Sequence, residues 1–250
     1  MPTDDFFPTF FPELPEDDPF NDKFDRLQIG SRYLVMNMGT MLIILTVYVA
    51  LYLAFPIFKF IKNDSKCGKR QYKKLRPVLF WTHAILFVQE GFMDILIASA
   101  VNLFYINEGE LKWETWSLAF TNTLSIFMVA CCGILVIFIL GYLLPRFDNL
   151  SDKTYEYKYF PAYEMLNLKN GRWTFMWPIL FFARRVLFVI AVCAVVDYAV
   201  VQILMWLVPT LIVMIMTPLA KPLIEHGSNS LETYNQFSIL AMTYCVMCFT

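Results

Sequence analysis

The fold of this chain is decided by residues 181–236, FFARRVLFVIAVCAVVDYAVVQILMWLVPTLIVMIMTPLAKPLIEHGSNSLETYNQ. Between Val186 and Ala220 the only charged side chain is Asp197, and Gln202 follows it closely. A single straight helix over this range would be about 50 Å long, which exceeds the roughly 30 Å thickness of a bilayer core. We therefore predict two membrane spans that meet in a tight polar turn at Asp197.

Cationic residues mark both ends of this helical hairpin. Arg184 and Arg185 lie near the start of its first span, and Lys221 directly follows its second span. The two ends are expected on the same side of the membrane, because a hairpin returns the chain to the side it left.

The composition supports a membrane protein independently of the hairpin. Of the 250 residues, 58% are hydrophobic and only 16% are charged, whereas soluble domains carry about 25% charged residues. A net charge of -1 gives no basic excess for binding nucleic acid. The six cysteines lie in apolar segments except Cys67, which argues against a secreted disulfide framework.

No catalytic, metal or cofactor site is predicted. Two histidines do not supply a zinc site by themselves, and the chain has no glycine-rich phosphate loop, nucleophile elbow or zinc-protease motif. We expect a non-enzymatic protein.

The predicted fold is an all-α membrane protein, a helical bundle with five full transmembrane spans and the start of a sixth. The spans cover residues 33–58, 78–106, 117–144, 179–197 and 199–220, and the sixth covers 237–250. The last apolar run reaches only 14 residues, shorter than the roughly 20 needed to cross a bilayer. We therefore expect the polypeptide to continue beyond Thr250.

The loops predict the orientation of these spans. The acidic, proline-rich tail 1–32 is expected outside, and the loops 59–77, 145–178 and 221–236 are expected in the cytoplasm. The loop 59–77 carries eight Lys and Arg residues against one Asp, and short loops rich in Lys and Arg stay cytoplasmic. The same loop is suited to contact anionic lipid headgroups. The protein is expected in the plasma membrane or an endomembrane.

Three ionisable residues in the second predicted span form a pattern. His83, Glu90 and Asp94 are seven and then four residues apart, so on one helix they fall within an arc of roughly 40°. Ionisable groups inside a span face the bundle interior or a wet cavity. The stripe is interpreted either as a cation or proton path or as an interhelical contact, with Arg184 or Arg185 as its partner. Asn37, Asn122 and Gln202 are interpreted as interhelical hydrogen-bonding residues.

Several segments resemble a known family. The hairpin carries Arg184, Arg185 and Gln202, and KPLIEHGSNSLETYNQ follows its second span. In that segment the family pattern of Lys-Pro, Asn, Leu-Glu and a second Asn corresponds to Lys221, Pro222, Asn229, Leu231, Glu232 and Asn235. These features resemble the TRP-like polytopic membrane domain, found at the C-termini of large ciliate surface proteins and, more distantly, in fungal TRP-like proteins.

The resemblance extends to residues 20–40, with Asn37 and Gly39, and to residues 80–104, with Glu90. The family usually places Glu after the second Asn, whereas this chain has Gln236. A role for a carboxylate at that position therefore does not carry over.

The resemblance implies a polytopic protein related to cation channels. The leading hypothesis is cation conduction or sensing, with His83, Glu90 and Asp94 as the polar path and the hairpin as a structural switch region. The alternative is a non-conducting structural or scaffolding subunit of a larger membrane assembly. A transporter is a third hypothesis, although the sequence has no inverted repeat. The expected partners are membrane lipids, further subunits or copies of the chain, and cations.

The orientation can be tested by glycosylation. The sequons at Asn63 and Asn149 are cytoplasmic in the predicted topology, so both should stay unmodified in a eukaryotic host. Glycosidase digestion should leave the electrophoretic mobility unchanged. A mobility shift that disappears when both asparagines are changed to Gln would reverse the orientation.

Overall fold

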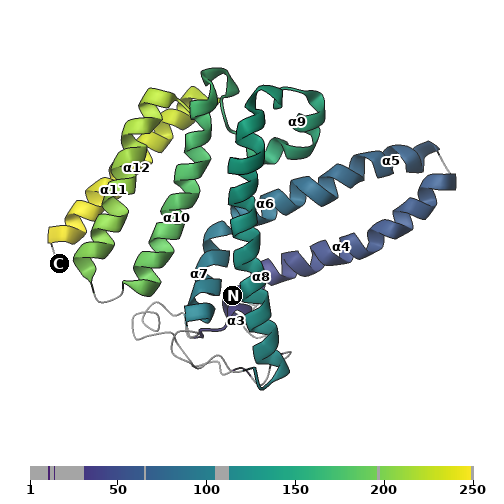
Figure 1. The fold of residues 1–250 in the computed structure, drawn as a ribbon, viewed down its shortest axis with the longest axis horizontal. Coiled ribbons are helices and arrows are strands. Elements are labelled where there is room, and N and C mark those ends of the chain that lie inside the picture. Colours follow the sequence, from purple (N-terminus) through teal and green to yellow (C-terminus); the bar gives the residue numbers. More distant parts are fainter. Residues whose placement is uncertain are drawn as a thin grey trace. The chain divides into compact units, whose positions relative to one another are not determined.

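A computed structural model describes residues 11, 14, 31–64, 66–104, 113–195 and 198–248 (Figure 1). These residues form helices joined by turns, and none of them belongs to a strand. They fold as two compact units, Met1–Gly133 with Tyr157–Tyr159 and Ile134–Glu156 with Phe160–Thr250. Most of the predicted tail 1–32, together with Asp197 and Thr250, lies outside the described residues.

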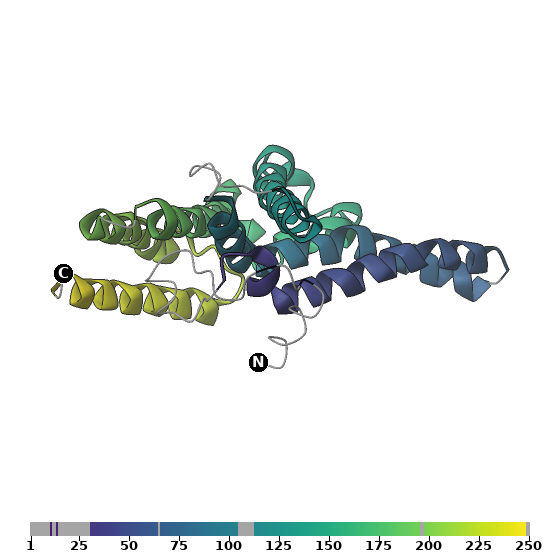
Figure 2. The same ribbon diagram turned by 90° about the horizontal axis from the view of Figure 1, so that it is seen from below.

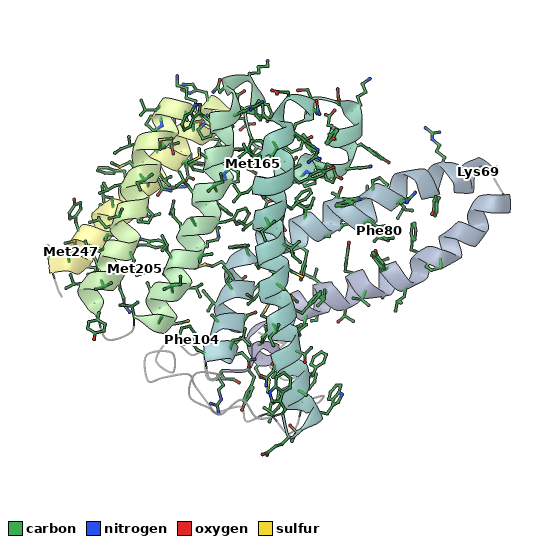
Figure 3. The ribbon with its side chains drawn as sticks, viewed as in Figure 1. Lys69, Phe80, Phe104, Met165, Met205 and Met247 are labelled. Carbon is green, nitrogen blue, oxygen red and sulfur yellow. The ribbon has the colours of Figure 1, made fainter. Side chains whose placement is uncertain are left out.

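The first unit is built from α3 (Leu34–Asn37), α4 (Gly39–Asp64), α5 (Lys66–Pro77), the π-helix η1 (Val78–Thr82), α6 (His83–Glu90), α7 (Phe92–Phe104) and most of α8 (Trp116–Ile137). Helix α4 runs beside the arm formed by α5, η1 and α6 (Figures 1 and 2). Aromatic side chains join the two arms: the ring centroid of Phe80 lies 4.4 Å from that of Tyr52 and 5.2 Å from that of Phe55 (Figure 3).

Residues 59–77, predicted as a loop, are helical where the structure describes them. Helix α4 continues to Asp64 and α5 begins at Lys66, while Ser65 lies outside the described residues. The physical reason is that eight of the 12 residues of α5 are Lys, Arg, Gln or Leu, which are all good helix formers. Charge density alone therefore does not indicate an irregular loop.

The second predicted span is not one straight helix. The helical segments Leu75–Glu90 and Phe92–Phe104 are bent by 65° at Gly91. A Cβ atom at Gly91 would lie 3.0 Å from the carbonyl oxygen of Phe87 and 3.0 Å from the terminal methyl carbon of Met41 on α4. Glycine therefore permits the break and the close approach of α4 at the same position.

Buried polar side chains join α7 to α8. The Nδ2 of Asn102 donates to the Oδ1 of Asn122 at 3.1 Å and to the Oγ of Ser125 at 2.9 Å. The predicted interhelical role of Asn122 is confirmed. The same prediction for Asn37 is wrong, because its side chain donates to the backbone carbonyl of Ser31 just before its own helix.

The second unit follows the end of α8 through η3 (Phe138–Leu143), η4 (Leu144–Asn149), α9 (Lys153–Tyr159), η5 (Phe160–Ala162), η6 (Leu168–Asn170) and η7 (Arg172–Phe175) to α10 (Met176–Ala194), α11 (Ala199–Ala220) and α12 (His226–Cys248). Within the predicted loop 145–178, the structure therefore holds one short α-helix, α9. Helices α10 and α11 form the predicted hairpin. Helix α12 packs on α11 and lies in a separate layer from the hairpin (Figures 1 and 2).

Four helical segments in the described part of the chain are long and apolar enough to cross a membrane: Gly39–Pro56, Trp116–Asn149, Arg172–Ala194 and Ala199–Ala220. The bent pair at Gly91 raises this number to five if it crosses as one broken span. The chain is therefore helical with several candidate membrane spans.

The predicted sixth span, 237–250, begins inside helix α12 and stays a prediction. Helix α12 begins at His226, eleven residues before the predicted start at Phe237, and is not among the candidate spans. Its first half is the polar sequence predicted as the loop 221–236. Polar residues such as Ser, Asn and Gln are compatible with a helix that packs on a neighbour, so the helix extends beyond the apolar run that predicts the span.

We predict that Gly91→Ala lowers the stability of the protein. The added methyl group is pressed against a backbone oxygen that does not move easily, and such overpacking costs about 1–3 kcal/mol. Thermal unfolding in detergent micelles should show the loss.

The matched control is Gly133→Ala on α8, where an added Cβ meets no atom within 4 Å. This variant should be neutral or more stable by at most about 1 kcal/mol. Equal melting temperatures for the two variants would contradict the crowding at Gly91.

Candidate functional site

A groove of about 310 Å³ lies between α4 and α6 in the first unit. Two of the three predicted site residues, His83 and Glu90, line it together with Tyr48. The remaining lining residues are apolar, Met41, Ile44, Val47, Leu51, Leu86 and Phe87. The groove therefore places one carboxylate and one imidazole on an otherwise mostly apolar surface.

Asp94 does not line this groove, so the prediction of a single three-residue stripe is wrong. Glu90 is the last residue of α6, whereas Asp94 lies in the first turn of α7, beyond the 65° bend. The three side chains would share an arc of roughly 40° only on one straight helix, and the chain bends at Gly91. The two carboxylates instead flank the break, one on each helix.

The groove also contains a contact that the sequence did not predict. The hydroxyl of Tyr48 on α4 donates to the backbone carbonyl of Leu79, inside the π-helix η1. The ring of Tyr48 meets that of His83 edge-on, with centroids 6.3 Å apart. The two tyrosines in this apolar run, Tyr48 and Tyr52, were the available signal, although tyrosine is common in such runs.

Polar oxygens near the break remain without partners. Glu90 makes no hydrogen bond or ion pair within the described residues. The Oε1 of the preceding residue, Gln89, is one of three buried side-chain polar atoms that lack a hydrogen bond there. No group of three or more His, Cys, Asp and Glu side chains in the described ranges could hold a metal ion.

The second unit holds a polar network that joins its three long helices. The guanidinium of Arg184 on α10 donates to the Oε1 of Gln236 on α12 at 3.0 Å. Gln236 in turn donates to the carboxylate of Glu232, four residues earlier on the same helix. Arg184 also lies 5.6 Å from the ring centroid of Trp206 on α11. The guanidinium group of Arg184 on α10 therefore contacts both α11 and α12.

Gln236 and Trp206 are the members of this network that the sequence did not single out. Gln236 is 2% exposed, yet the sequence marked it only as a departure from the family pattern. Its spacing of four residues from Glu232 was the available signal, because such pairs share a helix face.

Two of the predicted hairpin residues, Gln202 and Arg185, make contacts with residues of α10. The Nε2 of Gln202 on α11 donates to the carbonyl of Ala191 on α10 at 3.0 Å, which confirms its predicted interhelical role. Arg185 lies 3.4 Å from the ring centroid of Phe181, on its own helix. Asp197 lies outside the described residues.

The turn between α11 and α12 contains the Lys-Pro part of the family pattern. Lys221 adopts a left-handed conformation, φ 43° and ψ 60°, at the end of α11. The carbonyl of Pro222 accepts from the backbone N–H of Asn167 at 2.7 Å. The side chain of Asn170 donates to the carbonyls of Ala220 and Lys221 at 3.2 Å and 2.9 Å. The turn is thus fastened to the segment around residues 167–170.

Asn229 stabilises the same turn from within. Its Nδ2 donates to the carbonyls of Leu223 at 2.8 Å and Glu225 at 3.0 Å, and its Oδ1 accepts from the N–H of Leu223 at 3.1 Å. Asn235, in contrast, is exposed on α12. The asparagines of the pattern therefore differ in role, one closing a turn and one lying on the surface.

A buried tyrosine stabilises the segment that receives this turn. The hydroxyl of Tyr163 donates to the carbonyl of Leu150 at 3.1 Å. Burial raises the pKa of Tyr163 to about 12, and the negative charge of Glu156 adds to the shift. The phenol therefore stays protonated, as a donor must, at neutral pH.

Comparisons with protein-family models, with curated proteins and with solved structures found no match.

We predict that Gln236→Leu destabilises the second unit. The substitution removes the acceptor of a half-buried guanidinium, and leaving such a group unpaired costs about 1–3 kcal/mol or more. Thermal unfolding in micelles should show the loss.

Asn235→Leu is the matched control, because the neighbouring amide is exposed and surface changes stay within about 0.5 kcal/mol. If both variants melt together, the Arg184–Gln236 hydrogen bond contributes nothing to stability.

Proposed function

We propose that the protein is a multi-pass membrane protein that conducts cations, and that Glu90 is the carboxylate which the cation meets. The observation that carries this proposal is the break at Gly91, where two apolar helical segments meet at 65° with a carboxylate on each side. Non-helical backbone at membrane depth is tolerated where it is buried in protein or lines a water-filled cavity.

The end of α6 is electrostatically suited to a cation. The C-terminal end of a helix carries a partial negative charge, equivalent to about half an elementary charge. Glu90, the last residue of α6, adds a full carboxylate at this point. The C-terminal ends of broken membrane helices coordinate cations in transporters for the same reason.

The carboxylate of Glu90 is exposed and is available to a ligand. Glu90 has no hydrogen-bond or ion-pair partner in the described part of the chain, and the adjacent Gln89 has a buried oxygen with none. Carboxylate and amide oxygens are the ligands that hard cations prefer. His83, two helical turns from Glu90, extends the polar surface along the same groove.

The alternative is a non-conducting scaffold, in which polar residues only hold helices together. The paired side chains favour it: Asn102 with Asn122, Gln202 with the carbonyl of Ala191, and Arg184 with Gln236 all have partners within the chain. Glu90 differs from this group because it has none.

The test is cation flux into proteoliposomes that contain the full polypeptide. The parent should carry sodium or potassium, and Glu90→Gln should abolish that flux because it removes the charge and keeps the shape. Glu164→Gln, a change of the same type at an exposed residue outside the candidate spans, should leave flux unchanged. Equal recovery of folded protein is the control for stability.

The variant Asp94→Asn distinguishes the contribution of Asp94 to flux from that of Glu90. Because Asp94 lies outside the groove, its neutralisation should reduce flux less than that of Glu90. Absence of flux from the parent, or full flux from Glu90→Gln, would contradict the proposal. Absence of flux together with stable co-purifying subunits would favour the scaffold.

A further inference from the structure

A second cavity, of about 440 Å³, lies among α10, α11 and α12 and is independent of the cation site proposed above. Each of the three helices contributes to its wall, among others through Phe188, Met205 (Figure 3) and Ile239. A cavity of this size falls in the range of about 300–1,000 Å³ that is typical of ligand pockets.

The lining is unsuited to water. No charged side chain borders the cavity, and the polar groups at its wall are few. Gln202 already donates to Ala191, and the hydroxyl of Thr243 donates to the carbonyl of Ile239 at 2.8 Å. A buried water needs two to four polar partners, so the favoured occupant is apolar.

The wall residues show which part of each helix borders the cavity. Val192 and Gln202 lie near the turn of the α10–α11 hairpin, and the wall continues along α10 to Leu187. On α12 it runs from Ile239 to Val246, which spans about 10 Å at 1.5 Å per residue. The wall therefore follows each helix for about one to two turns.

A polar contact limits the apolar space at the end away from the hairpin turn. The hydrogen bond from Arg184 to Gln236 joins α10 to α12 three residues before the wall residues Leu187 and Ile239. A long apolar molecule that enters from the hairpin end would therefore reach this contact and stop.

We propose that the cavity holds a segment of one acyl chain of a membrane phospholipid. Both α10 and α11 are apolar enough to cross a bilayer, so in a membrane the hydrocarbon beside these two helices supplies the occupant. Wall atoms without neighbours lose dispersion contacts, and an acyl chain restores those contacts without a buried polar group.

The experiment uses phosphatidylcholine vesicles in which the acyl chain carries a photoactivatable diazirine. After irradiation, the labelled residues of the reconstituted protein are mapped by mass spectrometry. The parent should be labelled at the wall residue Met205 and also at Ile215, which is 55% exposed on α11 outside the cavity. Ile215 reports ordinary contact with bulk lipid.

Val192→Trp fills the cavity and should abolish labelling at Met205 while labelling at Ile215 persists. Val186→Trp is the matched control, the same change on the same helix at an exposed position outside the cavity. It should leave both labels unchanged. If Val192→Trp does not fold, Ile203→Trp fills the same cavity from α11.

Two results would overturn the proposal. One is a parent that is labelled at Ile215 but not at Met205. The other is a folded, cavity-filling variant that keeps the label at Met205. If neither filling variant folds, labelling of the parent at Met205 decides the outcome. A second protein chain cross-linked at the cavity wall in place of lipid would also overturn it.

Discussion

The apolar helices of this chain place one constraint on their polar side chains, because in hydrocarbon the donors and acceptors come from the protein itself. Asn102 satisfies this constraint across α7 and α8, and Arg184 satisfies it across α10 and α12. Apolar packing alone distinguishes poorly between the faces of a helix in lipid. These hydrogen bonds therefore select the faces that meet, and the aromatic and aliphatic contacts follow from that selection.

Glu90 and Asp94 stand outside this pattern, because both carboxylates are exposed and neither has a partner within the described residues. A carboxylate without a partner is costly in an apolar environment and is retained where it meets water or an ion. The break at Gly91 places Glu90 at the end of α6, beside the groove that also receives His83. A Cβ atom at Gly91 would crowd both the carbonyl oxygen of Phe87 and the methyl group of Met41.

The residues around Lys221 that carry the resemblance have a physical role in the second unit. Lys221 ends α11 in a left-handed conformation, Pro222 offers a carbonyl to the segment around Asn167, and Asn229 closes the turn. These residues build the connection between α11 and α12. That connection sets the position of α12 along α10. It therefore decides whether Gln236 lies within hydrogen-bonding distance of Arg184.

The sequence by itself determined that the chain is helical, rich in candidate membrane spans and folded back at the α10–α11 hairpin. It could do so because the fit of a segment to water or to the bilayer core depends on its own composition and length. Tertiary structure decided the rest. The direction of the helix beyond Gly91 removed Asp94 from the groove, and the 52 residues between Arg184 and Gln236 left no local pattern to pair them. Such contacts depend on the directions of helix axes and on the packing between distant segments, which composition and periodicity do not encode.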